Sequence, residues 1–220
     1  MALTALSPLI REAWLDALSP QRFRTYVAAA GGDEERALRL YRWNSIVAGA
    51  WFPLLSLVEV TLRNGIHTAI AEGTGRDDWW HLLRLDEKTA RNITTAETNI
   101  ARSYGTVHPG RVVAELSLGD WVRLLGTGGR RRGVAVDYVK LIWRPWLSKR
   151  FPAANRRDMH SRAENIRRLR NRVAHHEPLL AVNLADAHRD VLAFATILSP
   201  IISAEIASVS MIPGLPANRP

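Results

Sequence analysis

The sequence predicts an all-α fold, a helical bundle with an N-terminal helical extension, and three observations support it. Apolar residues recur at helical spacing in blocks separated by helix-breaking residues, no segment shows convincing strand alternation, and no internal repeat is present. Of the 220 residues, 47% are hydrophobic and 23% are charged, which excludes a disordered or collagen-like chain. The absence of cysteine excludes a disulfide scaffold and any cysteine-based metal or nucleophile site.

Capping residues and breakers predict the helices of the N-terminal half. Ser7-Pro8 and Ser19-Pro20 each have the pattern of an N-cap followed by proline at the first helical position. Asp33 is expected to cap the next helix, and Pro53 to open a separate, centrally buried helix that Gly73 ends.

The C-terminal half is expected to continue in helices. The sequence GTGGRRRG, at 126–133, is interpreted as a basic, flexible loop that lacks the Gly-Lys-Ser/Thr ending of a phosphate-binding loop. The tail from Ile212 is expected to be loose. About eight helices in all are expected for such a bundle. In this half of the chain they are expected over 86–105, shortly after Ser117, over 137–149, over 158–175 and from Asp186 onward. The helix after Ser117 is short, the Trp-rich helix 137–149 is broken at Pro145, and the helix from Asp186 is the last long one.

The charge indicates a phosphate-rich partner. The chain carries a net charge of +9 and has a pI of about 10.9, and 27 of its 30 basic residues are arginine. Arginine presents a planar fork of donors that suits phosphates. A GC-rich genome would explain the preference for arginine over lysine but not the excess of positive charge, and a membrane surface is the second possible partner. The start of the chain is not expected to be a signal peptide, since it has no basic n-region and meets Arg11 and Glu12 too early. The most apolar stretch, 191–211, is not expected to span a membrane, since it contains Pro200 and Glu205. A cytoplasmic protein is therefore expected.

Two of the expected helices carry polar residues where apolar ones would be usual. On the helix from Pro53, Glu59, Arg63 and His67 follow one another at i, i+4 and i+8, in an order that favours a Glu–Arg ion pair. This stripe is either a buried ion pair that fixes helix register or one wall of an active site.

The second is the helix 158–175, which ends in ENIRRLRNRVAHHEP. Arg170 falls on the apolar stripe of Ile166 and Val173, where a guanidinium needs a partner or a pocket. Asn171 and His175 share a neighbouring face, which Glu164 and Arg168 extend. Arg170 and His175 converge only if the helix frays near Ala174 or the arginine side chain reaches across.

Such a set suits phosphodiester cleavage without a metal. An imidazole can accept the proton of a ribose 2′-OH or protonate the leaving oxygen. An arginine can hold the phosphate and stabilise its developing charge, and an asparagine can orient either group. The alternative for this pattern is a solvated charged face that ends in a histidine.

The segment RLRNRVAHHEPL, from Arg168 to Leu179, resembles the signature of HEPN-fold proteins, in which four to six residues separate an arginine from a histidine and a polar residue follows the arginine. The chain also resembles the Abi-like abortive-infection family at His175-His176, at ELSLGDWVRLL (115–125) and at VEVTLRNGIHTAI (58–70). The similarity spans about 33–183. It departs from the family at Leu118, where an aromatic residue is more usual, and at Asp120.

The resemblance implies an HEPN-like bundle, usually dimeric, and a metal-independent endoribonuclease that leaves a 2′,3′-cyclic phosphate. Arg170 would bind the phosphate, Asn171 would orient the site, His175 would act as acid and base, and His176 would assist or replace it. Glu59, Arg63 and Glu164 are assigned supporting roles. Such a protein would be a toxin or phage-defence effector without cofactor or metal, with RNA, a second copy and an antitoxin or regulatory protein as partners. The RNA-binding residues would be Arg130, Arg131, Arg132, Arg167, Arg168 and Arg172.

The resemblance also divides the chain into an N-terminal extension (1–32), an HEPN-like domain (33–183) and a C-terminal helix with its tail (184–220) packed on that domain. Some HEPN proteins have lost activity, so fold alone does not decide between enzyme and binding module.

Two alternatives remain at this point. A non-catalytic RNA-binding or sensor module would use the same arginines for electrostatic binding and would stack bases on Tyr138, Trp143 and Trp146, although such aromatics usually form core. A metal site would need His160 and Glu164 to converge with the residues 175–177, but adjacent histidines on one helix diverge by about 100°.

Overall fold

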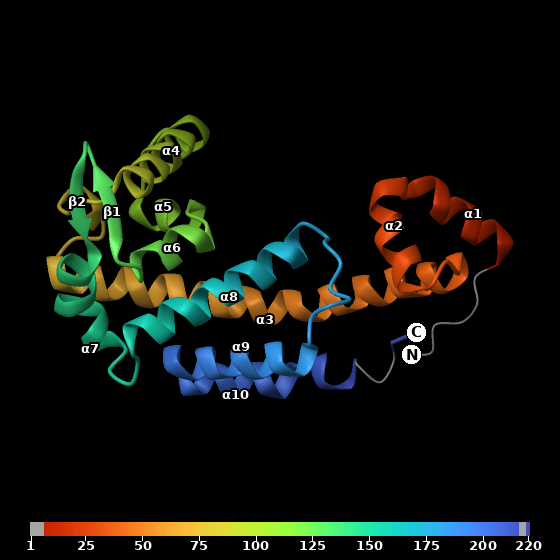
Figure 1. Cartoon of the computed structure of the whole chain (residues 1–220). Helices are drawn as coiled ribbons and strands as arrows, with labels where there is room; N and C mark the ends of the chain where they lie inside the picture. The colour runs from red at the N-terminus through yellow and green to blue at the C-terminus, as the bar shows by residue number, and fades with distance from the viewer. Residues whose placement is uncertain (1–6, 216–218) are drawn as a thin grey trace. The chain divides into compact units, whose positions relative to one another are not determined.

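The computed structural model describes residues 7–215 and 219–220, which form ten α-helices and one two-stranded antiparallel sheet (Figure 1). The predicted all-α class is therefore confirmed in its coarse form. The described chain divides into two compact units, each taken by itself below. Unit 1 comprises residues up to Leu55, Arg168–Leu192 and Glu205–Pro220, and unit 2 comprises Ser56–Arg167 and Ala193–Ala204. The three-segment division predicted from the sequence stays a prediction.

The first two helices of unit 1 begin as the sequence predicts. Helix α1 (Pro8–Ala17) starts after Ser7, whose hydroxyl accepts from the Ile10 amide, and α2 (Pro20–Ala29) starts after Ser19, which accepts from the Arg22 amide at 3.3 Å. Both helices have proline at the first position, where its missing N–H costs nothing. They pack with the first turns of α3 around a small apolar core of Leu18, Phe23, Tyr26, Ala30, Ala37, Leu38 and Leu40.

Helix α3 (Glu34–Thr74) is a single helix of 41 residues, so the prediction of a separate helix opening at Pro53 is wrong. Proline removes one backbone hydrogen bond and normally kinks or ends a helix. Pro53 itself lies on the exposed side, whereas Trp51 and Leu54 beside it are buried. Packing on both sides of the proline therefore holds the helix continuous.

Helix α3 is also, among the described residues, the one helix long and apolar enough to cross a membrane by length and composition. An 18-residue window within it has a mean hydropathy of 1.7, and 39% of that window is buried. A helix at the centre of a packed core meets the same criterion. The absence of a membrane span stays a prediction.

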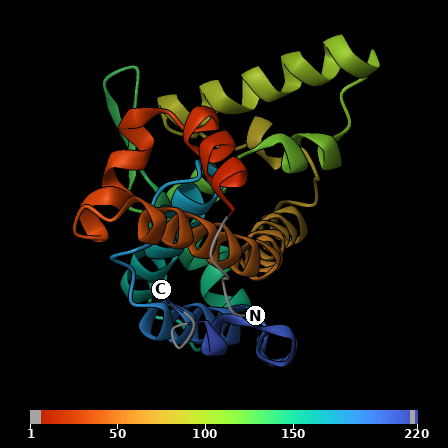
Figure 2. The ribbon, with the colours of Figure 1, turned by 90° about the vertical axis from the view of Figure 1, so that its right-hand side faces the viewer.

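The middle of unit 2 consists of α4 (Glu87–Tyr104), α5 (Pro109–Glu115) and α6 (Leu118–Leu124), and α4 lies beside α5 in both views (Figures 1 and 2). Asp86 caps α4 as predicted, accepting from the amides of Lys88 and Thr89. Asp120, a departure from the family pattern, accepts from the backbone N–H of Ser117 at 3.0 Å and from its hydroxyl at 2.6 Å. Its carboxylate therefore fixes the start of α6.

A β-hairpin follows, in place of the predicted flexible loop. Strands β1 (Gly128–Arg131) and β2 (Val134–Asp137) pair antiparallel, with Arg130 opposite Ala135. The two connecting residues, Arg132 and Gly133, have φ of 48° and 76°. Positive φ at both central positions is the mark of the type I′ turn, whose twist matches that of the strands. The expectation of no strand in the chain is therefore wrong at this segment.

The Trp-rich segment after the hairpin is a π-helical stretch (Val139–Leu147) that continues into the short helix α7 (Ser148–Arg150). The wider π turn accommodates Pro145 inside the helix, where the sequence analysis expected a break. The indole of Trp146 covers Gly73 at the end of α3, so closely that a methyl group on Gly73 would lie 2.0 Å from the indole nitrogen.

The chain ends in α8 (Arg156–Ala174), α9 (Leu184–Leu198) and α10 (Pro200–Val209). The predicted last helix is thus two helices, interrupted at Ser199, because proline starts the second one. The C-terminal tail, which the sequence analysis expected to be loose, is packed at residues 212–215, whereas residues 216–218 lie outside the described part of the chain. Ile212 is fully buried, and the Trp43 indole N–H donates to the carbonyl of Leu215 at 3.3 Å.

Candidate functional site

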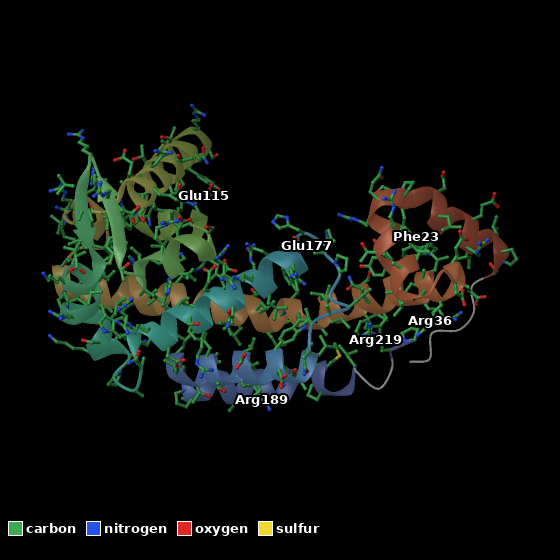
Figure 3. All side chains as sticks on the ribbon, in the orientation of Figure 1. Phe23, Arg36, Glu115, Glu177, Arg189 and Arg219 are labelled. Atoms are coloured by element: carbon green, nitrogen blue, oxygen red, sulfur yellow. The ribbon has the colours of Figure 1, made fainter. Side chains whose placement is uncertain are left out.

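The C-terminal end of α8, in unit 1, is a closed Schellman cap. The amide of Glu177 donates to the carbonyl of Arg172 at 2.8 Å, and the amide of His176 donates to that of Val173 at 3.2 Å. His176 takes the left-handed conformation, with φ of 55°, which glycine usually occupies at this position. Figure 3 labels Glu177 just beyond the helix end. The helix therefore ends in a defined geometry, whereas the sequence analysis considered fraying near Ala174.

The segment after the cap is tied to α3 within unit 1. Leu179 is fully buried, and its amide donates to the side-chain carbonyl of Asn44 at 2.6 Å. Asn44 is itself only 4% exposed. Because an unpaired buried amide is costly, Asn44 holds the chain in place three residues after His176.

The motif residues Arg170, Asn171, His175 and His176 lie at this same end of α8. The His175 amide donates to the Asn171 carbonyl at 2.9 Å, so the helical hydrogen bonding continues one residue past Ala174. His175 consequently lies one turn beyond Asn171 on the same face, as the spacing predicts. His175 and His176 are exposed, and Arg170 and Asn171 are half-buried. The end of α8 thus presents two exposed imidazoles, and because the helix does not fray at Ala174, convergence of Arg170 with His175 depends on the reach of the arginine side chain.

A largely apolar groove of about 410 Å³ borders His176. Tyr41 and Phe52 of α3 and Val173 of α8 contribute to its lining, and Phe52 is 64% exposed. Small residues of α3, Ser45, Ala48 and Gly49, also line it. A planar apolar group can therefore lie against an aromatic ring next to an imidazole.

The arginines assigned to RNA binding differ in exposure and pairing. Arg130, Arg132, Arg168 and Arg172 are exposed, and Arg131 is half-buried. Arg172 lies 3.8 Å from the Glu177 carboxylate. Arg167 is half-buried and pairs with Glu164 through two hydrogen bonds of 2.8 and 2.5 Å, which raise the pKa of Arg167. Its charge is therefore engaged within the protein, which makes it the weakest of these candidates.

The supporting residues Glu59, Arg63 and Glu164 all belong to unit 2. Glu59 and Arg63 are half-buried on α3, and the Nε of Arg63 donates to the Asn64 side-chain oxygen at 3.4 Å. Glu164 pairs with Arg167. Their role beside the residues of unit 1 stays a prediction.

Four further candidates from the sequence, His67 and three aromatic residues, have structural roles in unit 2. The Nδ1 atom of His67 accepts from the indole N–H of Trp79 at 3.1 Å, and burial lowers the pKa of His67. Tyr138 and Trp143 are buried, so they are core residues and cannot stack bases in this structure, and Trp146 packs on Gly73.

Tyr138 also carries a buried polar contact. Its hydroxyl donates to the Asp86 carboxylate at 2.6 Å and accepts from the Asp86 amide at 3.0 Å. Burial and this contact raise the pKa of Tyr138. Burial acts to raise the pKa of Asp86, but the hydrogen bonds from Tyr138 and Thr89 hold it below its usual range.

Within residues 7–215 and 219–220, no group of three histidine, aspartate or glutamate side chains is placed to hold a metal ion. The sequence reasoning missed Asn44, whose only signal is a polar side chain inside the apolar run of α3. Comparison with protein-family models, curated proteins and solved structures gives no match to this chain.

Proposed function

We propose that this protein is a metal-independent endoribonuclease of the HEPN type that uses Arg170, Asn171 and His175. The observation that carries the proposal is the closed helix end, which presents two exposed histidines one turn after Arg170 and Asn171 in a backbone fixed by the cap and by Asn44. A catalytic set needs such preorganisation, because small displacements of the reacting groups are costly in rate.

The reaction requires two proton transfers and no metal. The ribose 2′-oxygen attacks the adjacent phosphorus while an imidazole accepts the 2′-OH proton. The bond from phosphorus to the 5′-oxygen breaks, and that oxygen takes a proton from a second acid. The products are a 2′,3′-cyclic phosphate and a 5′-hydroxyl. Arg170 binds the non-bridging oxygens and stabilises their growing charge, and Asn171 orients the phosphate.

His175 performs one of the two proton transfers in this proposal. The other falls to His176 or to a second copy of the chain, in the homodimer that the family resemblance implies. The groove of Tyr41, Phe52 and Val173 beside His176 offers a surface for the base next to the cut. The net charge of +9, with Arg168 and Arg172 exposed near the helix end, favours a polyanionic substrate.

The test is incubation of the full chain with total cellular RNA in EDTA. We expect cleavage that leaves cyclic-phosphate ends, detected by mass spectrometry of the fragments. Arg170→Ala and His175→Ala should each lose at least about a hundredfold in rate. Arg157→Ala, an exposed arginine in the first turn of α8, is the matched control and should cut like the wild type.

Circular dichroism of each variant establishes that it is folded. Cleavage that needs a divalent metal, or that persists in both folded variants, overturns the proposal.

The cellular role is part of the same proposal. An unrestrained cytoplasmic ribonuclease arrests growth, so we expect a toxin or phage-defence effector that an antitoxin or regulatory partner holds in check. Expression of the wild type should stop growth of a bacterial host, and expression of His175→Ala at the same level should not. Equal growth under both would contradict the toxic role.

A second candidate is a non-catalytic RNA-binding module, which the exposed Arg130 and Arg132 at the hairpin tip favour. Retention of RNA without cleavage, with affinity that falls steeply with salt, would support this candidate. Replacing both arginines by Gln should then weaken binding, while His175→Ala should leave binding unchanged.

A further inference from the structure

A polar cleft in unit 2 has none of Arg170, Asn171, His175 and His176 in its lining. Its volume is about 590 Å³, within the usual range for small-ligand sites. Helices α4, α6 and α8 line it, together with the glycine-containing loop 126–128 that precedes the hairpin. All of its lining residues belong to unit 2, so the cleft is complete within one compact unit.

The lining of the cleft carries more positive than negative charge. Lys88, Arg123 and Arg167 are the cations. The two carboxylates are Asp120 and Glu164, so the sum is positive even with the imidazole of His160 neutral.

Both carboxylates are already engaged. Asp120 accepts from the Asn92 amide group at 2.5 Å and from Ser117 at 2.6 and 3.0 Å. Glu164 pairs with Arg167 through two hydrogen bonds. The charges left for a ligand are those of Lys88 and Arg123.

Arg123 has an unused buried donor. Among the described residues, its Nε is buried and has no hydrogen-bond partner. A buried N–H of this kind is costly unless a ligand or a water satisfies it. Arg123 acts electrostatically on Asp86, but the Asp86 oxygens already accept from Tyr138 and Thr89. The guanidinium therefore keeps donors for a further acceptor.

The glycine loop brings a third group to the cleft. A side chain at Gly126 would begin 3.5 Å from the Nε2 atom of His160 and 3.0 Å from the Arg123 carbonyl. The imidazole therefore lies against the loop, on the same cleft as Arg123 and Lys88. Two cations and an imidazole facing one polar cleft suit a tetrahedral anion with several acceptor oxygens.

We propose that this cleft binds a small phosphate monoester, such as a sugar phosphate, with the phosphate held by Arg123, Lys88 and His160. Ligand hydroxyls would donate to the carboxylates and to the Asn92 carbonyl at the cleft wall. The lining contains no Phe, Tyr or Trp ring, so a nucleobase would add little. The site is separate from the proposed catalytic residues and does not depend on RNA cleavage.

Isothermal titration calorimetry of the full chain with ribose 5-phosphate, inorganic phosphate and ribose tests the proposal. We expect ribose 5-phosphate to bind more tightly than phosphate and ribose not to bind. Adenosine 5′-monophosphate should bind within about twofold of ribose 5-phosphate, since no stacking partner is present. A clear preference for the nucleotide would overturn the assignment to a sugar phosphate.

Three variants locate the site. Arg123→Gln should weaken ribose 5-phosphate binding at least tenfold, which is about the loss of one charge-assisted hydrogen bond. Lys88→Gln, at an exposed residue that folding does not require, should weaken it severalfold. Arg91→Gln, exposed on the same helix but outside the lining, should bind like the wild type.

The site would be overturned if the wild type does not bind ribose 5-phosphate at 10 mM, a dissociation constant that corresponds to a binding free energy of about 2.7 kcal/mol. Equal losses of affinity in Lys88→Gln and Arg91→Gln would also overturn it. Either result leaves the RNA cleavage assay unaffected, so failure of this inference is distinct from failure of the proposed function.

Discussion

His176→Gly tests the closed helix end directly, because this substitution should raise stability while removing a side chain from the candidate site. His176 holds φ of 55° at the position of the Schellman cap that favours glycine. Its side chain is exposed, so little packing is lost when it is removed. The two cap hydrogen bonds come from backbone amides and are retained in the variant.

The expected gain follows from two opposing costs. The left-handed conformation costs an L-residue roughly 1–2 kcal/mol, and glycine avoids this cost. Glycine in turn loses more conformational freedom on folding, about 0.5–1 kcal/mol. The net stabilisation is therefore about 0.5–1 kcal/mol, which corresponds to a rise in Tm of roughly 1–4 °C for a chain of this size.

Thermal unfolding followed by circular dichroism measures this difference. His175→Gly is the matched control, because His175 is exposed but still makes the helical hydrogen bond to Asn171. Glycine there should lower stability by about 0.3–0.5 kcal/mol, the difference in helix propensity. His176→Ala keeps an L-residue in the left-handed conformation and should therefore not raise Tm. The reasoning is refuted if His176→Gly unfolds at or below the wild-type temperature, or if the two glycine variants shift Tm in the same direction.

Three further predictions concern stability. Asn44→Ala removes the acceptor of a buried amide and should lower the free energy of unfolding, measured in urea, by about 1–3 kcal/mol. A smaller loss would contradict the role of Asn44 as an anchor. Gly73→Ala places a methyl group on the Trp146 indole and should destabilise by about 1–3 kcal/mol, whereas Gly49→Ala, in open space on the same helix, should stabilise by about 0.4–1 kcal/mol. Burial lowers the pKa of His67 from 6.5, so the unfolded chain binds a proton that the folded chain does not. Stability should therefore fall as the pH drops below about 6.5, and His67→Gln should flatten that dependence; an unchanged pH profile would refute this role.

The helix starts could be predicted from the sequence because they depend on local chemistry. Ser19, Asp86 and Ser117 each begin a helix where the sequence analysis expected one. A capping side chain satisfies amides two or three residues away, so no distant part of the chain is needed. Pro53 failed as a predictor for the opposite reason, since buried neighbours on both sides override the local preference of proline.

The hairpin was missed because its strands are only four residues long. Gly128 to Arg131 contains no residue that favours strands, so neither alternation nor propensity marks it. The available signal was Arg132-Gly133 directly before Val134, a turn with glycine at its second central position.

The candidate site could be predicted only along the helix. Spacing placed Asn171 and His175 on one face, and the backbone agrees. The bond between Asn44 and Leu179 joins residues 135 positions apart, and helical periodicity carries no information about such a partner. Nearby residues therefore suffice to predict where a site lies along its helix, whereas the distant side chain that holds the site in place cannot be predicted in this way.

The contact between Asp86 and Tyr138 has a consequence for local opening of unit 2. One carboxylate caps α4 and binds the residue that leads out of the hairpin, 52 positions later. Loss of this contact exposes the first amides of α4 and releases the end of β2 in the same event. Backbone amides at these two places should therefore exchange with solvent deuterium at a common rate, as one cooperative unit, despite their separation in the chain.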